Sequence, residues 1–127
     1  MYIDANSIKI NDTYMGEYIT SVRYGYHKLW GSDTGRNSLD GTFSGTLKGV
    51  FPKFTLRFRR LTKTELETLA PILDSASQQF TYYDPNLKTE KTLTTYTGDW
   101  EIENKGFVSD SRRNDGFEMS FISMSRR

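Results

Sequence analysis

The most constraining feature of this sequence is a helix-start signal set between two strand patterns, within the stretch Phe54 to Pro85. Thr62 and Glu65 have the T-x-x-E spacing of a capping box, in which each side chain satisfies a backbone donor of the first helical turn. Leu61, just before this motif, is placed to form a hydrophobic staple with Leu66. The motif therefore predicts a helix that starts at Thr62.

The apolar positions after the cap predict that this helix packs on a core. They recur at the i, i+3, i+4 and i+7 spacing of one helix face: Leu66, Leu69, Ala70 and Leu73. Pro71 lies within the same segment, lacks a backbone N–H and clashes with the preceding turn. The sequence therefore predicts a kink at Pro71, or a break after which Pro71 opens a second short turn.

Strand patterns flank the predicted helix on both sides. Before it, Phe54, Leu56 and Phe58 alternate with polar residues, which is the period-2 pattern of a strand with one buried face. After it, Gln79 to Tyr83 predicts a returning strand, which ends at the turn sequence Asp84-Pro85-Asn86. A single helix among strands must lie across a sheet or close one end of a barrel.

The rest of the chain contains further strand patterns and two long polar segments. The polar segments, residues 30–41 and 105–116, are rich in Gly, Ser, Asn and Asp and predict loops. A turn is expected at Phe51-Pro52-Lys53. The further strands are expected around Ile8 and Ile10 and over residues 17–29, 42–50, 92–97, 100–103 and 117–121.

These patterns together predict the fold class. Roughly six to eight strands and one helix indicate an α+β fold, a mostly antiparallel β-sandwich or barrel with one flanking helix. A chain of 127 residues is large enough for one core and too small for two ordinary ones, so residues 1–127 are expected to form a single domain.

Composition argues against several classes of function. The formal net charge is +1, so no overall charge draws the chain toward nucleic acid or an anionic membrane. The chain has no cysteine, which removes disulfides, thiolate metal sites and cysteine nucleophiles. No apolar run approaches the roughly 20 residues that span a bilayer, and the first residues lack the pattern of a signal peptide. We expect no membrane association.

Candidate catalytic residues are few. His27 is the single histidine, so two histidines of one chain cannot share a metal. No G-x-S-x-G nucleophile motif is present. The carboxylates available for paired acid–base chemistry are turn residues or alternate on the outer face of an expected strand: Asp84, Asp99, Glu101 and Glu103. The sequence therefore predicts no enzymatic activity, no metal and no cofactor.

Two sets of side chains leave binding functions open. One is a basic cluster that a small single-stranded nucleic-acid-binding β-domain would use, unless its members pair with acids of a neighbouring strand or subunit: Lys53, Arg57, Arg59 and Arg60. The other is a set of aromatic residues on which a carbohydrate-binding module would stack sugar rings, unless they pack across strands: Tyr82, Tyr83, Tyr96 and Trp100.

A family resemblance covers about residues 28 to 100. A tryptophan-led, glycine-rich segment is followed by a series of short motifs in a fixed order: Gly35-Arg36-Asn37, Gly41-Thr42-Phe43-Ser44-Gly45, Leu56-Arg57-Phe58, Leu61-Thr62-Lys63-Thr64-Glu65, Tyr82-Tyr83-Asp84-Pro85 and Tyr96-Thr97-Gly98-Asp99. This order resembles the small tail proteins of long-tailed bacteriophages and prophages, and the tail-tube-like domain of tube, distal-tail and hub proteins.

The resemblance implies a structural role. It suggests a subunit of a phage tail or tail tip, as part of a tube, distal-tail or hub-adaptor ring. Its partners would be further copies of itself and other tail proteins. DNA would pass through the ring lumen without specific recognition, and the protein would be found in the virion tail after assembly in the bacterial host cytoplasm. A carbohydrate-binding module at the tail tip is the alternative.

Residues 30–41 are the candidate subunit interface. The segment is too long and too polar to be core, yet it begins with a tryptophan and contains an arginine, two residue types enriched at interface hot spots. In an assembled ring it would lie on the neighbouring subunit, with Trp30 in a pocket and Arg36 paired with a carboxylate. The residues expected at this interface are Trp30, Gly35, Arg36 and Asn37.

Overall fold

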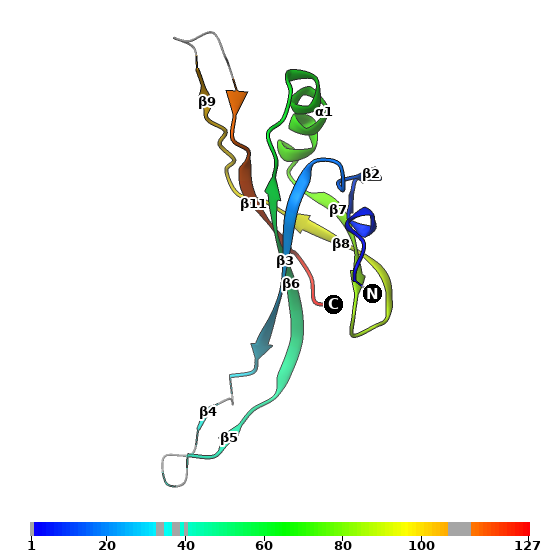
Figure 1. Cartoon of the computed structure of the whole chain (residues 1–127). Helices are drawn as coiled ribbons and strands as arrows, with labels where there is room; N and C mark the ends of the chain where they lie inside the picture. Colours follow the sequence, from blue (N-terminus) through cyan, green and yellow to red (C-terminus); the bar gives the residue numbers. More distant parts are fainter. Residues whose placement is uncertain (1, 33–34, 37–38, 40, 107–112) are drawn as a thin grey trace.

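The computed structural model describes residues 2–32, 35–36, 39, 41–106 and 113–127 (Figure 1). The protein is mostly antiparallel β, with a seven-stranded sheet that is not closed into a barrel and one α-helix. The strand order is β2-β1-β7-β8-β11-β6-β3. The strands of this sheet are β1 Lys9–Ile10, β2 Thr13–Tyr14, β3 Ile19–Trp30, β6 Leu47–Phe58, β7 Gln78–Asp84, β8 Thr89–Tyr96 and β11 Phe117–Ser123.

Four short strands form two further ladders outside this sheet. β4 (Gly35–Arg36) pairs with β5 (Phe43–Ser44), and β9 (Asn104–Lys105) pairs with β10 (Arg113–Asn114). A 3-10 turn, η1 (Ala5–Ser7), precedes β1. In the described residues no helix is long and apolar enough to cross a membrane.

The sheet bends so that its two halves face each other across an aromatic core. Phe54 of β6 stacks on Phe80 of β7 with 4.3 Å between ring centroids, although β8 and β11 lie between these strands in the sheet. Phe80 also packs against Phe121 of β11, and Tyr24 of β3 meets Tyr82 of β7 edge to face. The packing is sandwich-like within one sheet, because alternate residues of each strand point inward.

The helix α1 (Lys63–Leu73) begins as the sequence predicts. The Thr62 hydroxyl accepts the backbone N–H of Glu65 at 3.3 Å, and the Glu65 carboxylate accepts the backbone N–H of Thr62 at 3.0 Å. The predicted break at Pro71 is wrong, since α1 continues to Leu73. Pro71 is exposed and lies in the last turn, so the N–H that it lacks would have bonded one helical carbonyl, that of Glu67.

Two other local expectations differ from the structure. The expected turn at Phe51-Pro52-Lys53 lies inside β6, which is continuous from Leu47 to Phe58. β11 pairs with β6 only as far as Lys53, so at Pro52 only β3 flanks β6, and the missing N–H of proline is tolerated. Residues 100–103 form no strand, and Trp100 packs on Phe117 instead.

The two segments expected to be loops both contain antiparallel pairing. Residues 30–41 and 105–116 include β4 and β10, whose partner strands are β5 and β9. The ladders continue the hairpins that longer strands begin, so pairing extends into segments without strand periodicity. Figure 1 shows β4 and β5 at one end of the molecule, and α1 with β9 at the opposite end.

Candidate subunit interface

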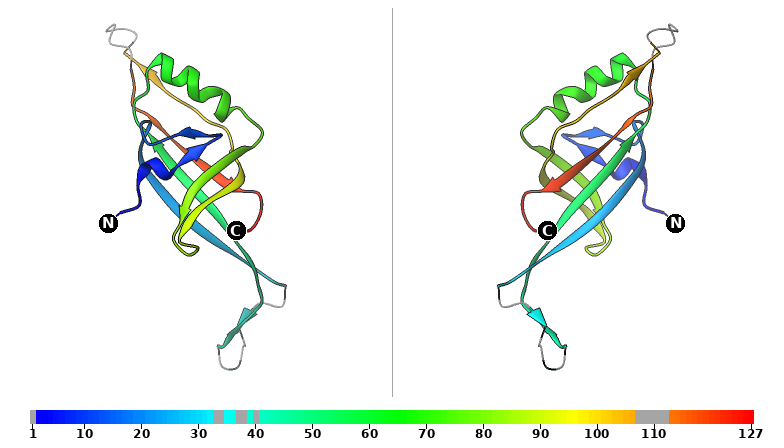
Figure 2. Two further views of the ribbon diagram at one scale, coloured as in Figure 1. Left: turned by 90° about the vertical axis from the view of Figure 1, so that its right-hand side faces the viewer. Right: turned by 90° about the vertical axis from the view of Figure 1, so that its left-hand side faces the viewer.

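The far end of the β3–β6 hairpin forms a projecting arm, defined here as the described residues of 28–50 (Figure 2). β6 pairs with both β3 and β11 from Lys53 to Phe58, whereas from Leu47 to Pro52 it pairs with β3 alone. Beyond Trp30 the hairpin continues as the β4–β5 ladder. The arm therefore consists of two strands without further cover from the sheet.

Large apolar side chains gather on this arm and are only partly covered. Trp30 meets Phe43 edge to face, with ring centroids 5.1 Å apart. Trp30 is 38% exposed and Phe43 is 44% exposed, and the neighbouring Leu29 and Leu47 are about half exposed. We call these four residues the arm cluster. Since core aromatics of this protein are almost fully buried, the arm cluster is an exposed apolar surface of the kind that marks interaction sites.

Arg36 lies on the same cluster. β4 and β5 place Arg36 directly opposite Phe43, and the guanidinium carbon is 5.9 Å from the centroid of the Phe43 ring. The Arg36 Nη1 donates a hydrogen bond to the backbone carbonyl of Gly41 at 3.1 Å. This combination of stacking and a backbone hydrogen bond orients the guanidinium while leaving Arg36 exposed.

Of the four residues expected at the interface, the structure brings two together through a residue that sequence reasoning missed. Trp30 and Arg36 both contact Phe43, and Gly35 lies beside them opposite Ser44. Asn37 lies outside the described residues. The sequence does contain a feature that could have identified Phe43 as an interface residue. It is an isolated aromatic residue in a glycine-rich stretch, where no neighbouring side chain in the sequence is large enough to cover its ring.

Two arginines near the end of the sequence fix the base of the arm. Arg127 N–H donates to the Val50 carbonyl at 2.8 Å, and Arg126 Nη1 donates to the Lys48 carbonyl at 2.9 Å. A Cβ built on Gly49 would lie 2.8 Å from that of Arg126. The aliphatic stem of Arg126 therefore packs directly against the backbone at Gly49.

Arg127 also places its guanidinium next to a buried polar site. Arg127 Nε lies 3.4 Å from the carboxylate of Asp84, which is fully buried, and the guanidinium lies over the Tyr26 ring. The Tyr82 hydroxyl donates to Asp84 at 2.7 Å. Burial alone would raise the pKa of Asp84, but hydrogen bonds from Tyr82 and two backbone N–H groups, with the Arg127 charge, hold that pKa below its usual value. Burial beside Asp84 raises the pKa of Tyr26 to about 12.

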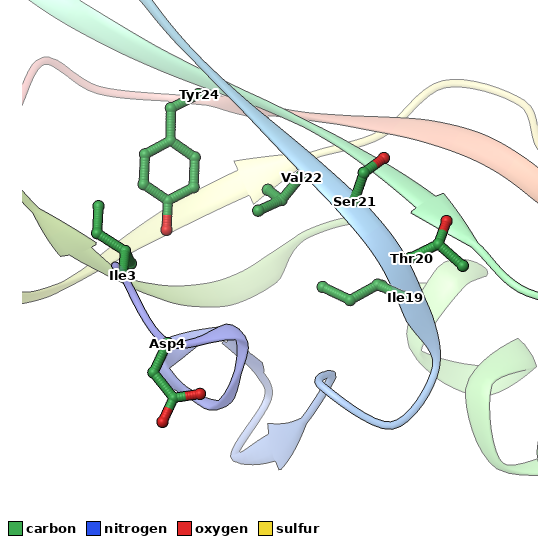
Figure 3. Close-up of a pocket in the computed structure, with 7 residues that line it drawn as sticks. All are labelled: Ile3, Asp4, Ile19, Thr20, Ser21, Val22 and Tyr24. Carbon is green, nitrogen blue, oxygen red and sulfur yellow. The ribbon is translucent and has the colours of Figure 1, made fainter. Parts of the chain in front are cut away.

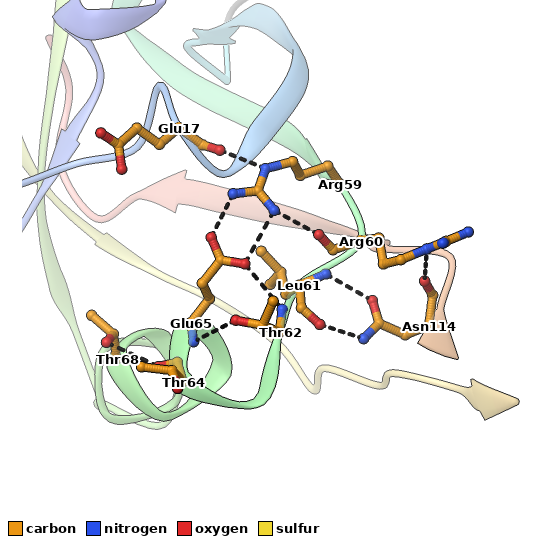
Figure 4. Close-up of polar contacts among 9 residues, drawn as sticks. All are labelled: Glu17, Arg59, Arg60, Leu61, Thr62, Thr64, Glu65, Thr68 and Asn114. Atoms are coloured by element: carbon orange, nitrogen blue, oxygen red, sulfur yellow. Dashed lines mark hydrogen bonds and ion pairs between the residues drawn. The ribbon is translucent and has the colours of Figure 1, made fainter. Parts of the chain in front are cut away.

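Arg59 and Arg60 of the basic cluster make structural contacts (Figure 4), whereas Lys53 and Arg57 lie on β6 opposite Ile122 and Glu118 of β11. Arg59 binds the Glu65 carboxylate through two nitrogens, donates to the Glu17 carbonyl at 2.6 Å and lies over the Tyr18 ring. Arg60 donates to the Asn114 carbonyl at 3.0 Å. Two of the four cluster members thus hold the junction between β6 and α1, which is the structural alternative to a phosphate-binding surface.

The junction also depends on a residue that sequence reasoning did not single out. Asn114 of β10 is buried, and its side chain both accepts from the Leu61 N–H at 3.0 Å and donates to the Leu61 carbonyl at 2.8 Å. These two bonds replace the strand partner that Leu61 lacks between β6 and α1. Asn114 therefore fixes the chain just before the capping box.

The four aromatic residues considered for carbohydrate binding do not form one platform. Tyr82 is fully buried in the core. Trp100 packs on Phe117 and donates its indole N–H to the Asp74 carboxylate at 2.8 Å, at the end of α1. Tyr83 and Tyr96 lie at opposite ends of the β7–β8 ladder. Stacking on a sugar would require exposed rings side by side, which this arrangement does not supply.

The few residues considered as catalytic candidates are also far apart in the fold. His27 is exposed on β3, opposite Phe51, while Asp84 is buried in the core. In the part of the chain that the structure describes, no group of three or more His, Asp or Glu side chains is arranged to hold a metal ion.

Comparisons with protein-family models, curated proteins and solved structures give no significant match to this chain.

Proposed function

We propose that this protein is a structural subunit of a bacteriophage tail or tail tip, which self-assembles into a ring and joins neighbouring tail proteins. The observation that carries the proposal is the projecting arm with its exposed Trp30–Phe43 pair and stacked Arg36. Tryptophan and arginine are the residue types most enriched at interface hot spots. The order of motifs along residues 28–100 supplies the tail assignment.

An exposed apolar arm is costly for an isolated chain and useful in an assembly. Its apolar surface stays in water until a partner covers it, and burial of apolar surface stabilises a contact by about 25 cal/mol per Å². A two-stranded arm also reaches beyond its own body, so it can bridge copies in a closed ring. The two alternatives, carbohydrate and single-stranded nucleic-acid binding, lack a comparable cluster, because their candidate residues are dispersed or engaged.

Self-assembly of the purified chain tests the proposal. We expect concentration-dependent oligomers by mass photometry and closed rings by electron microscopy. Leu47→Ala should weaken assembly, and Leu87→Ala is its matched control, because both leucines are 45% exposed but Leu87 lies in the turn after β7. Trp30→Ala and Arg36→Glu should weaken it more, since hot-spot side chains each contribute about 2 kcal/mol or more. Thermal unfolding shows whether each variant stays folded.

The tail assignment needs its own test. Antibodies against the chain, applied to purified tailed particles from a lysogen that carries the gene, should label the tail or its tip. Particles that lack the protein, or a chain that stays monomeric at every concentration, would remove the proposed role. Glycan binding by the isolated chain that is lost on Trp100→Ala would favour the carbohydrate-binding alternative instead.

A further inference from the structure

A groove runs beside the edge strand β3, far from the arm tip. The N-terminal segment before η1 and the first half of β3 line an open pocket of about 470 Å³ (Figure 3). In Figure 3, Ile19, Val22 and Tyr24 point from β3 toward the side on which the N-terminal segment lies, and Ile3 of that segment lines the same pocket. These residues give the groove an apolar floor, and Ile3 itself is 48% exposed.

The groove opens along an unpaired sheet edge. β3 is the last strand of the sheet and pairs only with β6, so one side of its backbone has no partner strand. Proteins usually shorten, cover or charge such an edge to prevent pairing with another chain. The β3 edge carries Arg23 and Lys28, but it is twelve residues long and has an apolar groove beside its first half. This combination favours docking of an extended segment.

The rim of the groove is acidic. Asp4 lines the groove and also an adjoining hollow of about 530 Å³, which is lined by Glu17 and Glu90 as well. Lys9 lies over the Tyr14 ring at the border of this hollow. The described residues that line the two hollows include no lysine or arginine. A partner with apolar side chains and a nearby cation therefore fits this surface.

The arm has the complementary chemistry. It presents the arm cluster together with Lys28, Arg36 and Lys48, and the whole stretch 28–50 contains three basic and two acidic residues, a net charge of +1. Both views in Figure 2 show the β4–β5 ladder directed away from the body and its N-terminal segment, so these strands do not reach the groove of their own chain. The occupant must therefore come from another molecule.

We propose that the arm of one copy docks in the groove beside β3 of the next copy. The inference rests on the proposed assembly role and names the surface that receives the arm. Trp30 and Phe43 cover the apolar floor formed by Ile19 and Val22, and Arg36 faces the acidic rim. Because donor and acceptor are different surfaces, the contact is head to tail, and such contacts generate rings when the rotation closes.

The absence of cysteine makes this contact accessible to cross-linking. One batch carries Leu47→Cys on the arm, and a second batch, enlarged by a tag, carries Ile3→Cys in the groove. Because Leu47 belongs to the arm cluster, both batches are used at concentrations at which electron microscopy shows that they still assemble. A short thiol-to-thiol cross-linker is added after the batches are mixed and assembled. We expect a tagged–untagged heterodimer as the main product. The control batch carries Glu67→Cys on the exposed face of α1 in place of Ile3→Cys, and it should give only background product.

Charge reversal supplies a second, independent readout. Arg36→Glu, or the pair Glu17→Lys with Glu90→Lys, should each weaken assembly about tenfold or more, since like charges then meet across the contact. Combining the three substitutions in one chain restores opposite charges and should recover assembly. These carboxylates are exposed, so the variants should keep the unfolding temperature of the parent chain.

The outcomes separate this inference from the proposed function. Rings that form while the Leu47→Cys and Ile3→Cys batches give no more product than the control would overturn the arm-to-groove contact and leave the assembly role intact. Failure of the triple charge variant to recover assembly would also count against the contact. A chain that never assembles would overturn both proposals.

Discussion

The Nε atom of Arg127 lies 3.4 Å from Oδ2 of Asp84, a carboxylate that is fully buried between the two halves of the sheet. Arg127 also donates its N–H to Val50 at the base of the arm. Arg127 therefore links the segment after β11 both to β6 and to the end of β7. We infer that this contact sets the position from which the arm projects.

Arg127→Ala should lower the free energy of unfolding by about 2 kcal/mol, because it leaves a buried carboxylate without its cation. The loss is smaller than for an unsupported charge, since Tyr82 and the N–H groups of Asn86 and Leu87 still donate to Asp84. Arg126→Ala is the control, because its guanidinium donates to the Lys48 carbonyl and its stem packs on Gly49, so its loss leaves no buried carboxylate without a cation. Urea unfolding measures both variants, and equal midpoints would contradict the role of Arg127.

Glu65 predicts a specific sensitivity to acid. The Arg59 hydrogen bonds, together with the Thr62 N–H, lower the pKa of Glu65 from 4.5 to about 2. A carboxylate with a lowered pKa stabilises the fold above its unfolded pKa, and this contribution is lost as pH falls toward the folded value. The stability difference between the parent chain and Glu65→Gln should therefore shrink between pH 4.5 and about 2.

Glutamine keeps an oxygen that can accept the Thr62 N–H, so Glu65→Gln removes the charge while the capping geometry remains available. Glu67→Gln is the control on the same helix, because Glu67 is exposed and its ion pair among the described residues is with the exposed Lys63, at 4.0 Å. Chemical denaturation at a series of pH values measures the effect. A pH-independent difference for Glu65→Gln would show that the ion pair with Arg59 contributes nothing.

The capping box gives a third prediction. Thr62→Ala removes the oxygen that accepts the Glu65 N–H and should cost about 1 kcal/mol of unfolding free energy. Thr64→Ala, two residues later on the exposed side of α1, should change stability by less than about 0.5 kcal/mol. If the two substitutions have the same effect in urea unfolding, the cap does not contribute to stability.

The parts of the fold that local chemistry determines were predictable from sequence. The Thr62–Glu65 box needs only residues three apart, and its two hydrogen bonds are present. The alternation of Phe54, Leu56 and Phe58 likewise depends only on the strand period, and all three are buried. The open form of the sheet was not predictable, because it depends on which distant strands meet at its edges.

Several of the differences between the expected and the observed structure arise from pairing between residues far apart in sequence. Pro52 suggests a turn locally, but Tyr26 of β3 pairs with it and keeps β6 extended. The bulge in β3 near Thr20 places Ile19 on the core side together with Val22, against the simple alternation. At the candidate interface, Trp30 and Arg36 were identifiable by residue type, whereas their shared contact with Phe43 follows from the β4–β5 register.

Gly116 gives the last prediction, because its backbone leaves no room for a side chain. Its φ is +85°, and a Cβ at this position would lie 2.1 Å from the Phe58 carbonyl oxygen. Gly116→Ala combines a strained backbone conformation with a clash against β6, so it should cost about 3 kcal/mol or more. Gly98→Ala is the matched control, since nothing lies within 4 Å of its Cβ position and its φ is not positive. Thermal unfolding of the two variants decides the matter, and similar melting temperatures would mean that β11 can shift away from Phe58 at little cost.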